Sequence, residues 1–222
     1  MLQTFLVLFI SGAIAFGMQH TVTRWDEPDG LMFDLKERLV FPLFLILQTS
    51  MLFSCLGALE DRIFFAVYLT MTFIIGVIDL RTQRIHRFFT LLTVAVGILY
   101  FLVKMIIGFP VSMGEYFFTV GLYFVLLAIL RKTKVLGLGD AIVLFGGCFF
   151  LLMLKAGTQA FMIEILLFHF IIANIAMIIT NFTRINWKKL KPDGSIAFVP
   201  DIYIATVVMV MTQPFLQQLL PT

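Results

Sequence analysis

The chain has 222 residues, of which 61% are hydrophobic and only 13% are charged, and its mean hydropathy is +1.04. The charged share is about half that of an ordinary soluble domain. A soluble fold of this size leaves much of its surface in water, so it could not hide this much apolar surface. The composition therefore excludes a water-soluble domain and predicts a protein whose solvent is the lipid bilayer.

Eight apolar runs are long enough, or nearly long enough, to cross the hydrocarbon core as helices. Each run is continuous instead of alternating, which favours helices over the strands of a transmembrane barrel. We therefore expect an all-α fold, a polytopic transmembrane helix bundle of about eight spans. The runs cover residues 2–18, 39–59, 62–80, 88–107, 115–131, 140–155, 159–181 and 196–219.

The basic residues lie in short loops between these runs, so the net charge of +3 is interpreted as a topology signal and no nucleic acid is expected as a partner. Lys and Arg cluster after the third, fifth and seventh runs. By the positive-inside rule these loops and the polar segment 19–38 are cytoplasmic, and both termini are outside. We divide the chain into two N-terminal spans with that cytoplasmic loop (1–61) and a six-span core (62–222).

Two acids stand at span ends that this topology places on the cytoplasmic side. Asp79 ends the third run, and Asp140 opens the sixth. Two complete crossings separate them, so they can meet at one membrane depth on helices of opposite direction. Ionisable groups within spans are costly, which makes such a pair a functional hypothesis. Other interpretations stay open: each acid could pair with a nearby Arg or Lys, or Asp140 could cap its helix.

Glycines beside both acids favour the paired interpretation. Gly137 and Gly139 precede Asp140, and Gly76 lies near Asp79. Glycine permits close approach and unusual φ values. Two carboxylates held close share one proton. The charged member can then activate a water, while the protonated member polarises a scissile carbonyl and protonates the leaving amine. This chemistry needs neither a metal nor a cofactor.

The stretch IDLRTQRI followed by GLGD resembles the two signatures of the GxGD-type intramembrane aspartyl proteases, and above all the type IV prepilin and archaeal preflagellin peptidases. The resemblance covers roughly residues 62–219. It implies that Asp79 and Asp140 are the catalytic acids. The segment 194–205 resembles a later family stretch that opens the last span. By resemblance or by position, the supporting or substrate-binding candidates are Gly76, His86, Gly137, Gly139, Phe198 and Pro200.

The resemblance implies an aspartic endopeptidase in a prokaryotic plasma membrane, with its active site facing the cytoplasm. Its partners would be the bilayer and a type IV prepilin-like precursor, a substrate of pilus assembly or protein secretion with a basic leader and a hydrophobic N-terminal helix. The chain departs from the family pattern after both acids, at 85–87 and 141–143. It also lacks the family's four-cysteine zinc element, which predicts cleavage without methyltransfer.

Two other functions remain open from the sequence. The acids could form a proton or cation site of a transporter or channel, or the chain could be a non-catalytic homologue with the same fold. His86 could tune the acids or contact substrate, or be a plain loop residue. His169, inside the seventh run, is expected to hydrogen bond to a neighbouring helix, as is Asn174.

Overall fold

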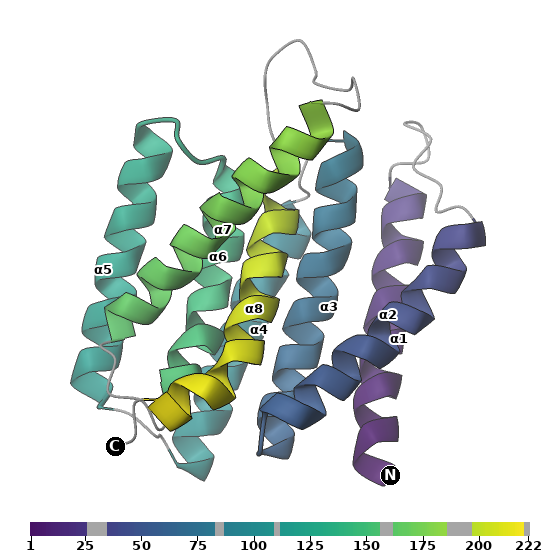
Figure 1. Ribbon diagram of the computed structural model, residues 1–222, viewed down its shortest axis with the longest axis horizontal. Coiled ribbons are helices and arrows are strands. Elements are labelled where there is room, and N and C mark those ends of the chain that lie inside the picture. The colour runs from purple at the N-terminus through teal and green to yellow at the C-terminus, as the bar shows by residue number, and fades with distance from the viewer. Residues whose placement is uncertain (26–34, 83–86, 109–111, 156–161, 186–196, 220–222) are drawn as a thin grey trace.

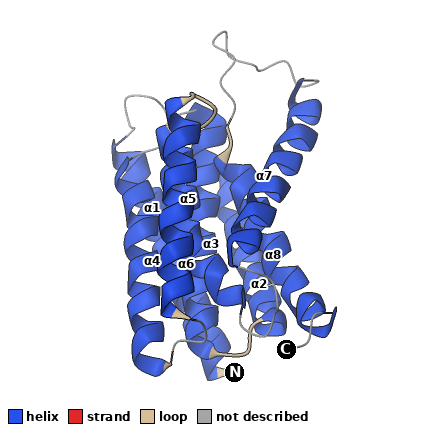
Figure 2. Ribbon diagram, turned by 90° about the vertical axis from the view of Figure 1, so that its left-hand side faces the viewer, coloured by secondary structure: helices blue, strands red, loops and turns tan. Residues whose placement is uncertain are grey.

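A computed structural model of the chain describes residues 1–25, 35–82, 87–108, 112–155, 162–185 and 197–219. Throughout these ranges the elements are helices joined by short connections, with no strand, as Figure 2 shows. The all-α prediction is confirmed. The helices are α1 (Leu2–Trp25), α2 (Leu35–Cys55), α3 (Leu59–Thr82), α4 (Arg87–Ile107), α5 (Met113–Lys132), α6 (Leu138–Leu151) with the short 3₁₀ turn η2 (Leu152–Lys155), α7 (Met162–Ile185) and α8 (Val199–Leu219).

Each helix corresponds to one predicted run, with shifted boundaries. Helix α1 continues to Trp25, past the expected end at residue 18, because no Gly or Pro interrupts the polar residues that follow Gly17. Five helices are long and apolar enough to cross a membrane, namely α1, α3, α4, α5 and α7. The apolar parts of α2 and α6 are shorter, at Phe41–Cys55 and Leu138–Leu154. The chain is therefore a multi-pass membrane protein.

Helix α3 is the centre of the bundle. It contacts α1, α2, α4, α6 and α8, and Figure 1 shows it between the N-terminal pair and the other helices. In its most apolar window 67% of the residues are buried, against 22–28% in the other four candidate spans. Those four helices therefore present most of their apolar side chains outward, as lipid-facing helices do.

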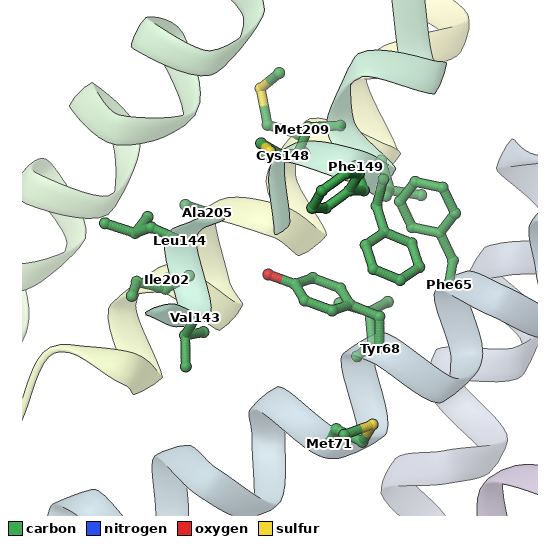
Figure 3. Close-up of a cluster of buried hydrophobic side chains, with 14 of the residues drawn as sticks. Phe65, Tyr68, Met71, Val143, Leu144, Cys148, Phe149, Ile202, Ala205 and Met209 are labelled. Carbon is green, nitrogen blue, oxygen red and sulfur yellow. The ribbon is translucent and has the colours of Figure 1, made fainter. Parts of the chain in front are cut away.

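Helices α3, α6 and α8 enclose a cluster of buried hydrophobic side chains (Figure 3). The ring of Tyr68 in α3 stacks on Phe150 in α6 with centroids 4.4 Å apart. Gly147 makes room for this ring, since a Cβ there would run into the Tyr68 hydroxyl. Ala205 and Met209 of α8 close the cluster from the third side. This packing fixes the positions of α3, α6 and α8 relative to one another.

Helices α4 and α6 approach each other through glycines. A Cβ added to Gly97 would lie 3.0 Å from the carbonyl oxygen of Gly146. A Cβ added to Gly146 would in turn lie 2.8 Å from Oγ1 of Thr93. Small residues let helix backbones come close in membranes, where dispersion contacts drive association. This contact fixes α6, and with it the start of that helix, against the bundle.

Three helix termini meet at one end of the bundle (Figure 1): α3 ends there, and α6 and α8 begin there. We call this the acidic end, because it carries Asp79, Asp140 and Asp201. Helix α7 crosses the bundle obliquely in Figure 1, and in Figure 2 its C-terminal part stands away from the other helices.

Candidate functional site

Asp79 joins the end of α3 to the start of α8. Its side chain lies in the last turn of α3 and is only 4% exposed. The backbone N–H of Val199 donates a hydrogen bond to Oδ2 of Asp79, with a distance of 3.2 Å. Val199 is the first residue of α8, and the first N–H groups of a helix have no partner within the helix. The positive end of α8 therefore faces the Asp79 carboxylate.

Gly76 permits this junction by letting two backbones touch. It lies one turn before Asp79, and a Cβ added there would be 3.2 Å from Cα and 3.3 Å from N of Pro200. Phe198 is buried, and its carbonyl accepts hydrogen bonds from the N–H groups of Asp201 and Ile202 in the first turn of α8. Three predicted supporting residues, Gly76, Phe198 and Pro200, thus surround Asp79.

Asp140 is the third residue of α6, which begins after Gly137 as its N-cap. Gly137 has φ −66° and ψ 157°, an extended conformation open to any residue. The expectation of unusual φ values is wrong here, and the glycine provides space instead. A Cβ at Gly137 would lie 2.7 Å from Oδ2 of Asp140. Gly139, the second residue of α6, immediately precedes the acid in the first turn.

The structure brings the two predicted acids together. Asp140 is half-buried, and the charges of Asp79 and Asp201 both act on its carboxyl group. Oδ1 of Asp140 is buried and accepts no hydrogen bond from the residues that the structure describes. Nor does any ion pair between described residues join Asp140 to Lys134, the cation nearest to it along the chain.

Asp201 is a component that sequence reasoning did not assign to the site. It lies in the first turn of α8 and is fully buried. The hydroxyl of Thr180 in α7 donates a hydrogen bond to Oδ1 of Asp201, at 2.9 Å. The signal that could have found it is its place directly after Pro200, an acid at the start of the last apolar run.

Other candidate residues lie elsewhere. His86 is outside the described residues. His169 is fully buried in α7, and its Nε2 lies 3.0 Å from Oγ1 of Thr206 in α8, so the predicted bond to a neighbouring helix is confirmed. The described bond of Asn174 instead runs from its side-chain amide to the Phe170 carbonyl of its own helix, 2.7 Å away. Phe170 lies one helical turn before Asn174, so its carbonyl is easier to reach than a group on another helix.

Comparison with known proteins identifies the family of this chain. No curated protein and no solved structure matches the chain significantly. The model of the type IV leader peptidase family matches residues 66–181, which include both Asp79 and Asp140, whereas Asp201 lies beyond the matched region. Because the match spans more than half of the sequence, this membrane-embedded chain belongs to the type IV leader peptidase family.

Proposed function

We propose that the protein is an intramembrane aspartyl endopeptidase that removes the leader of type IV prepilin-like precursors, with Asp79 and Asp140 as its catalytic dyad. The observation that carries this proposal is the convergence of the two acids. One ends α3 and is buried, the other begins α6 and is half-buried, and their charges interact. Membership of a leader peptidase family makes proteolysis the chemistry that such a pair would perform.

The reaction follows from two carboxyl groups that share one proton. The ionised acid takes a proton from water, whose oxygen attacks the carbonyl carbon of the scissile peptide bond. The protonated acid donates a hydrogen bond to the carbonyl oxygen and then gives its proton to the departing amine nitrogen. The C–N bond breaks, and the proton taken from water remains with the dyad. Neither a metal ion nor a covalent enzyme intermediate enters this scheme.

The acidic end suits a substrate that is itself anchored in the bilayer. The basic loops predict that this end faces the cytoplasm. A precursor with a hydrophobic helix would place the bond next to that helix at the same depth as Asp79 and Asp140. We propose that the leader, on the cytoplasmic side of the helix, is the part removed. The absence of the four-cysteine pattern from the sequence makes cleavage without methyltransfer part of this proposal.

The direct test is leader removal in membranes. The protein is co-expressed with a prepilin carrying a basic leader, and the shift in substrate size is followed for the wild type, Asp79→Ala and Asp140→Ala. We expect both variants to insert at wild-type levels and to lose cleavage by at least about 100-fold, the lower bound for general acid–base groups.

Glu164→Ala is the matched control, since it removes a carboxylate from the first turn of α7, an exposed position at the opposite end of the bundle. It is expected to cleave at the wild-type rate. Cleavage that survives both dyad substitutions would overturn the proposal. Proton or cation flux that depends on the acids, combined with no cleavage by the wild type, would favour the transporter alternative.

A further inference from the structure

Helices α1 and α2 line a groove with a volume of about 610 Å³. Figure 1 shows α2 crossing α1 obliquely, and the lining positions recur every three or four residues, so each helix contributes one face. Both helices precede the region that the family model matches, residues 66–181, so the groove is built outside it. The lining residues include Leu8, Gly12, Phe16 and His20 of α1 and Phe41 and Ile46 of α2.

The groove is apolar along its length and polar at one end. On α1 its lining runs from Leu8 to Gln19 and His20. Because α1 runs toward the acidic end (Figure 1), the two polar side chains lie nearest that end. No atom of the described residues lies within 4 Å of a Cβ added to Gly12, so the wall borders open space there. His20 is exposed, and its ring lies parallel to that of Phe16 with centroids 6.3 Å apart. A ring nitrogen of His20 can therefore donate to a ligand at this end.

The dimensions of the groove suit a lipid tail. Between Leu8 and His20 it follows about 18 Å of helix, at 1.5 Å per residue. The hydrocarbon of one leaflet is about 15 Å thick. A volume of about 610 Å³ over that length gives a mean cross-section of about 34 Å². A helix with its side chains is about 10–12 Å across and needs more than twice that section, whereas an alkyl chain is only about 4 Å across by carbon contact distances. The groove is therefore too narrow for a helix of a substrate or of a second copy.

Charges of both signs surround the polar end. Between residues 19 and 38 the sequence has three basic and five acidic residues. Arg24 is in the last turn of α1, and Lys36, Glu37 and Arg38 are in the first turn of α2. The other four acids belong to the segment that joins the two helices. Cations suit a phosphate and acids suit an ammonium group, whereas a purely anionic headgroup would meet an excess of like charge. A zwitterionic headgroup complements this mixture.

We propose that the groove binds one zwitterionic phospholipid, of the phosphatidylethanolamine type, from the leaflet at the acidic end. One acyl chain lies along the groove, and the phosphate accepts a hydrogen bond from a ring nitrogen of His20. Phe41, which is buried in the wall, contacts Phe73 of α3 with ring centroids 5.4 Å apart. The bound chain therefore packs on the layer that joins α2 to α3. Lipid binding here does not depend on proteolysis, so it can be tested without a substrate.

The first measurement is native mass spectrometry of the full chain, released from detergent micelles after palmitoyl-oleoyl phosphatidylethanolamine has been added. The wild type should retain one lipid. Gly12→Leu fills part of the groove and should weaken binding at least about tenfold, because the tail loses its packing along the wall. Gly17→Leu is the matched control, since its Cβ is equally open to space but the residue lies outside the groove. It should bind lipid as the wild type does.

The second measurement is the apparent unfolding temperature, because a ligand that binds only the folded state stabilises it. With lipid at a hundredfold excess over Kd, the temperature should rise by about 5 °C in the wild type and in Gly17→Leu, and by about half of that or less in Gly12→Leu. His20→Ala should weaken binding about fivefold, through the lost hydrogen bond to the phosphate. Phosphatidylglycerol with the same chains should bind several-fold more weakly than phosphatidylethanolamine.

Several outcomes would overturn the proposal. These are no retained lipid in the wild type, equal binding by the wild type and Gly12→Leu, or tighter binding of phosphatidylglycerol. A dimer that Gly12→Leu breaks would assign the groove to a second copy instead, and a precursor that co-purifies with the wild type but not with Gly12→Leu would assign it to the substrate helix. If Gly12→Leu does not accumulate, Ile46→Phe narrows the groove from α2, with Leu47→Phe, exposed outside the groove, as its control.

Discussion

The carboxylates at the two ends of helix α3 have different partners. At the end where α3 begins, Glu60 and Asp61 lie 3.2 and 2.5 Å from Nζ of Lys104, and the Tyr100 hydroxyl donates to Asp61 at 2.6 Å. At the acidic end, Asp79 meets a backbone N–H and the charges of further acids. The first arrangement pairs its acids with a cation, whereas the second brings acids from three helices to one end of the bundle.

Under the proposed function, this difference separates an acid that stabilises the fold from an acid that takes part in the reaction. A Lys between two carboxylates lowers the cost of holding charge near the bilayer. Two carboxylates held close raise the energy of the ionised pair, and a shared proton is one way to lower it. Local strain of this kind is typical of functional sites.

The same substitution at the two ends should have opposite consequences. Asp79→Asn is expected to lower leader cleavage about 1,000-fold, because the proposed dyad loses one of its two carboxyl groups. Its apparent unfolding temperature in detergent is expected to stay near the wild-type value or to rise. Asp61→Asn is expected to keep cleavage per folded molecule and to lower stability, because it weakens the bonds to Lys104 and Tyr100. Cleavage rate and apparent unfolding temperature are measured on both. Equal loss of cleavage in the two variants would contradict the expectation that only the acid at the acidic end is needed for cleavage.

Lys104→Met removes the cation that pairs with Glu60 and Asp61 at the end where α3 begins. The substitution keeps an apolar stem of similar length and leaves Glu60 and Asp61 without this partner. Breaking a fully buried ion pair costs about 3–5 kcal/mol, but these acids remain 27% and 23% exposed, so we expect about 2 kcal/mol of destabilisation. Denaturant titration in micelles measures it. Lys132→Met, at an exposed position in the last turn of α5, is the matched control and should change stability little.

Much of this fold was readable from hydrophobicity alone, because in lipid each continuous apolar run must satisfy its own backbone as a helix. The position of Asp79 and Asp140 at one end of the bundle was also readable, since two complete crossings separate them. The Val199 bond to Asp79 joins residues 120 positions apart, and the Lys104 contacts join residues about 44 apart. Such partners depend on which helices become neighbours, which no local pattern encodes.

Gly76→Ala tests whether the close contact between the backbones of α3 and α8 at the acidic end is needed. The added Cβ would meet Cα and N of Pro200 at 3.2 and 3.3 Å, and backbone atoms cannot move aside as a flexible side chain can. We expect α8 to shift, with about 1 kcal/mol of lost stability and a drop in cleavage of about tenfold as Asp79 loses its position.

Gly121→Ala is the control for helix propensity, because nothing lies within 4 Å of a Cβ at that position in α5. It should raise stability by up to about 1 kcal/mol. A similar gain in Gly76→Ala with full cleavage would show that the contact with Pro200 is not needed.

The smallest effect on stability is expected for the hydrogen bond between His169 and Thr206, which lies deeper in the span and away from the acids at both ends. Thr206→Val removes the hydroxyl that faces His169 at 3.0 Å and keeps the shape of the side chain. Interhelical hydrogen bonds in membranes contribute about 0.6 kcal/mol on average, so a double-mutant cycle with His169→Leu should yield a coupling of that size. Thr212→Val is the matched control, since that hydroxyl bonds only to carbonyls of its own helix. A coupling of several kcal/mol, or a loss of cleavage, would mean that the span interior shares in the chemistry of the acidic end.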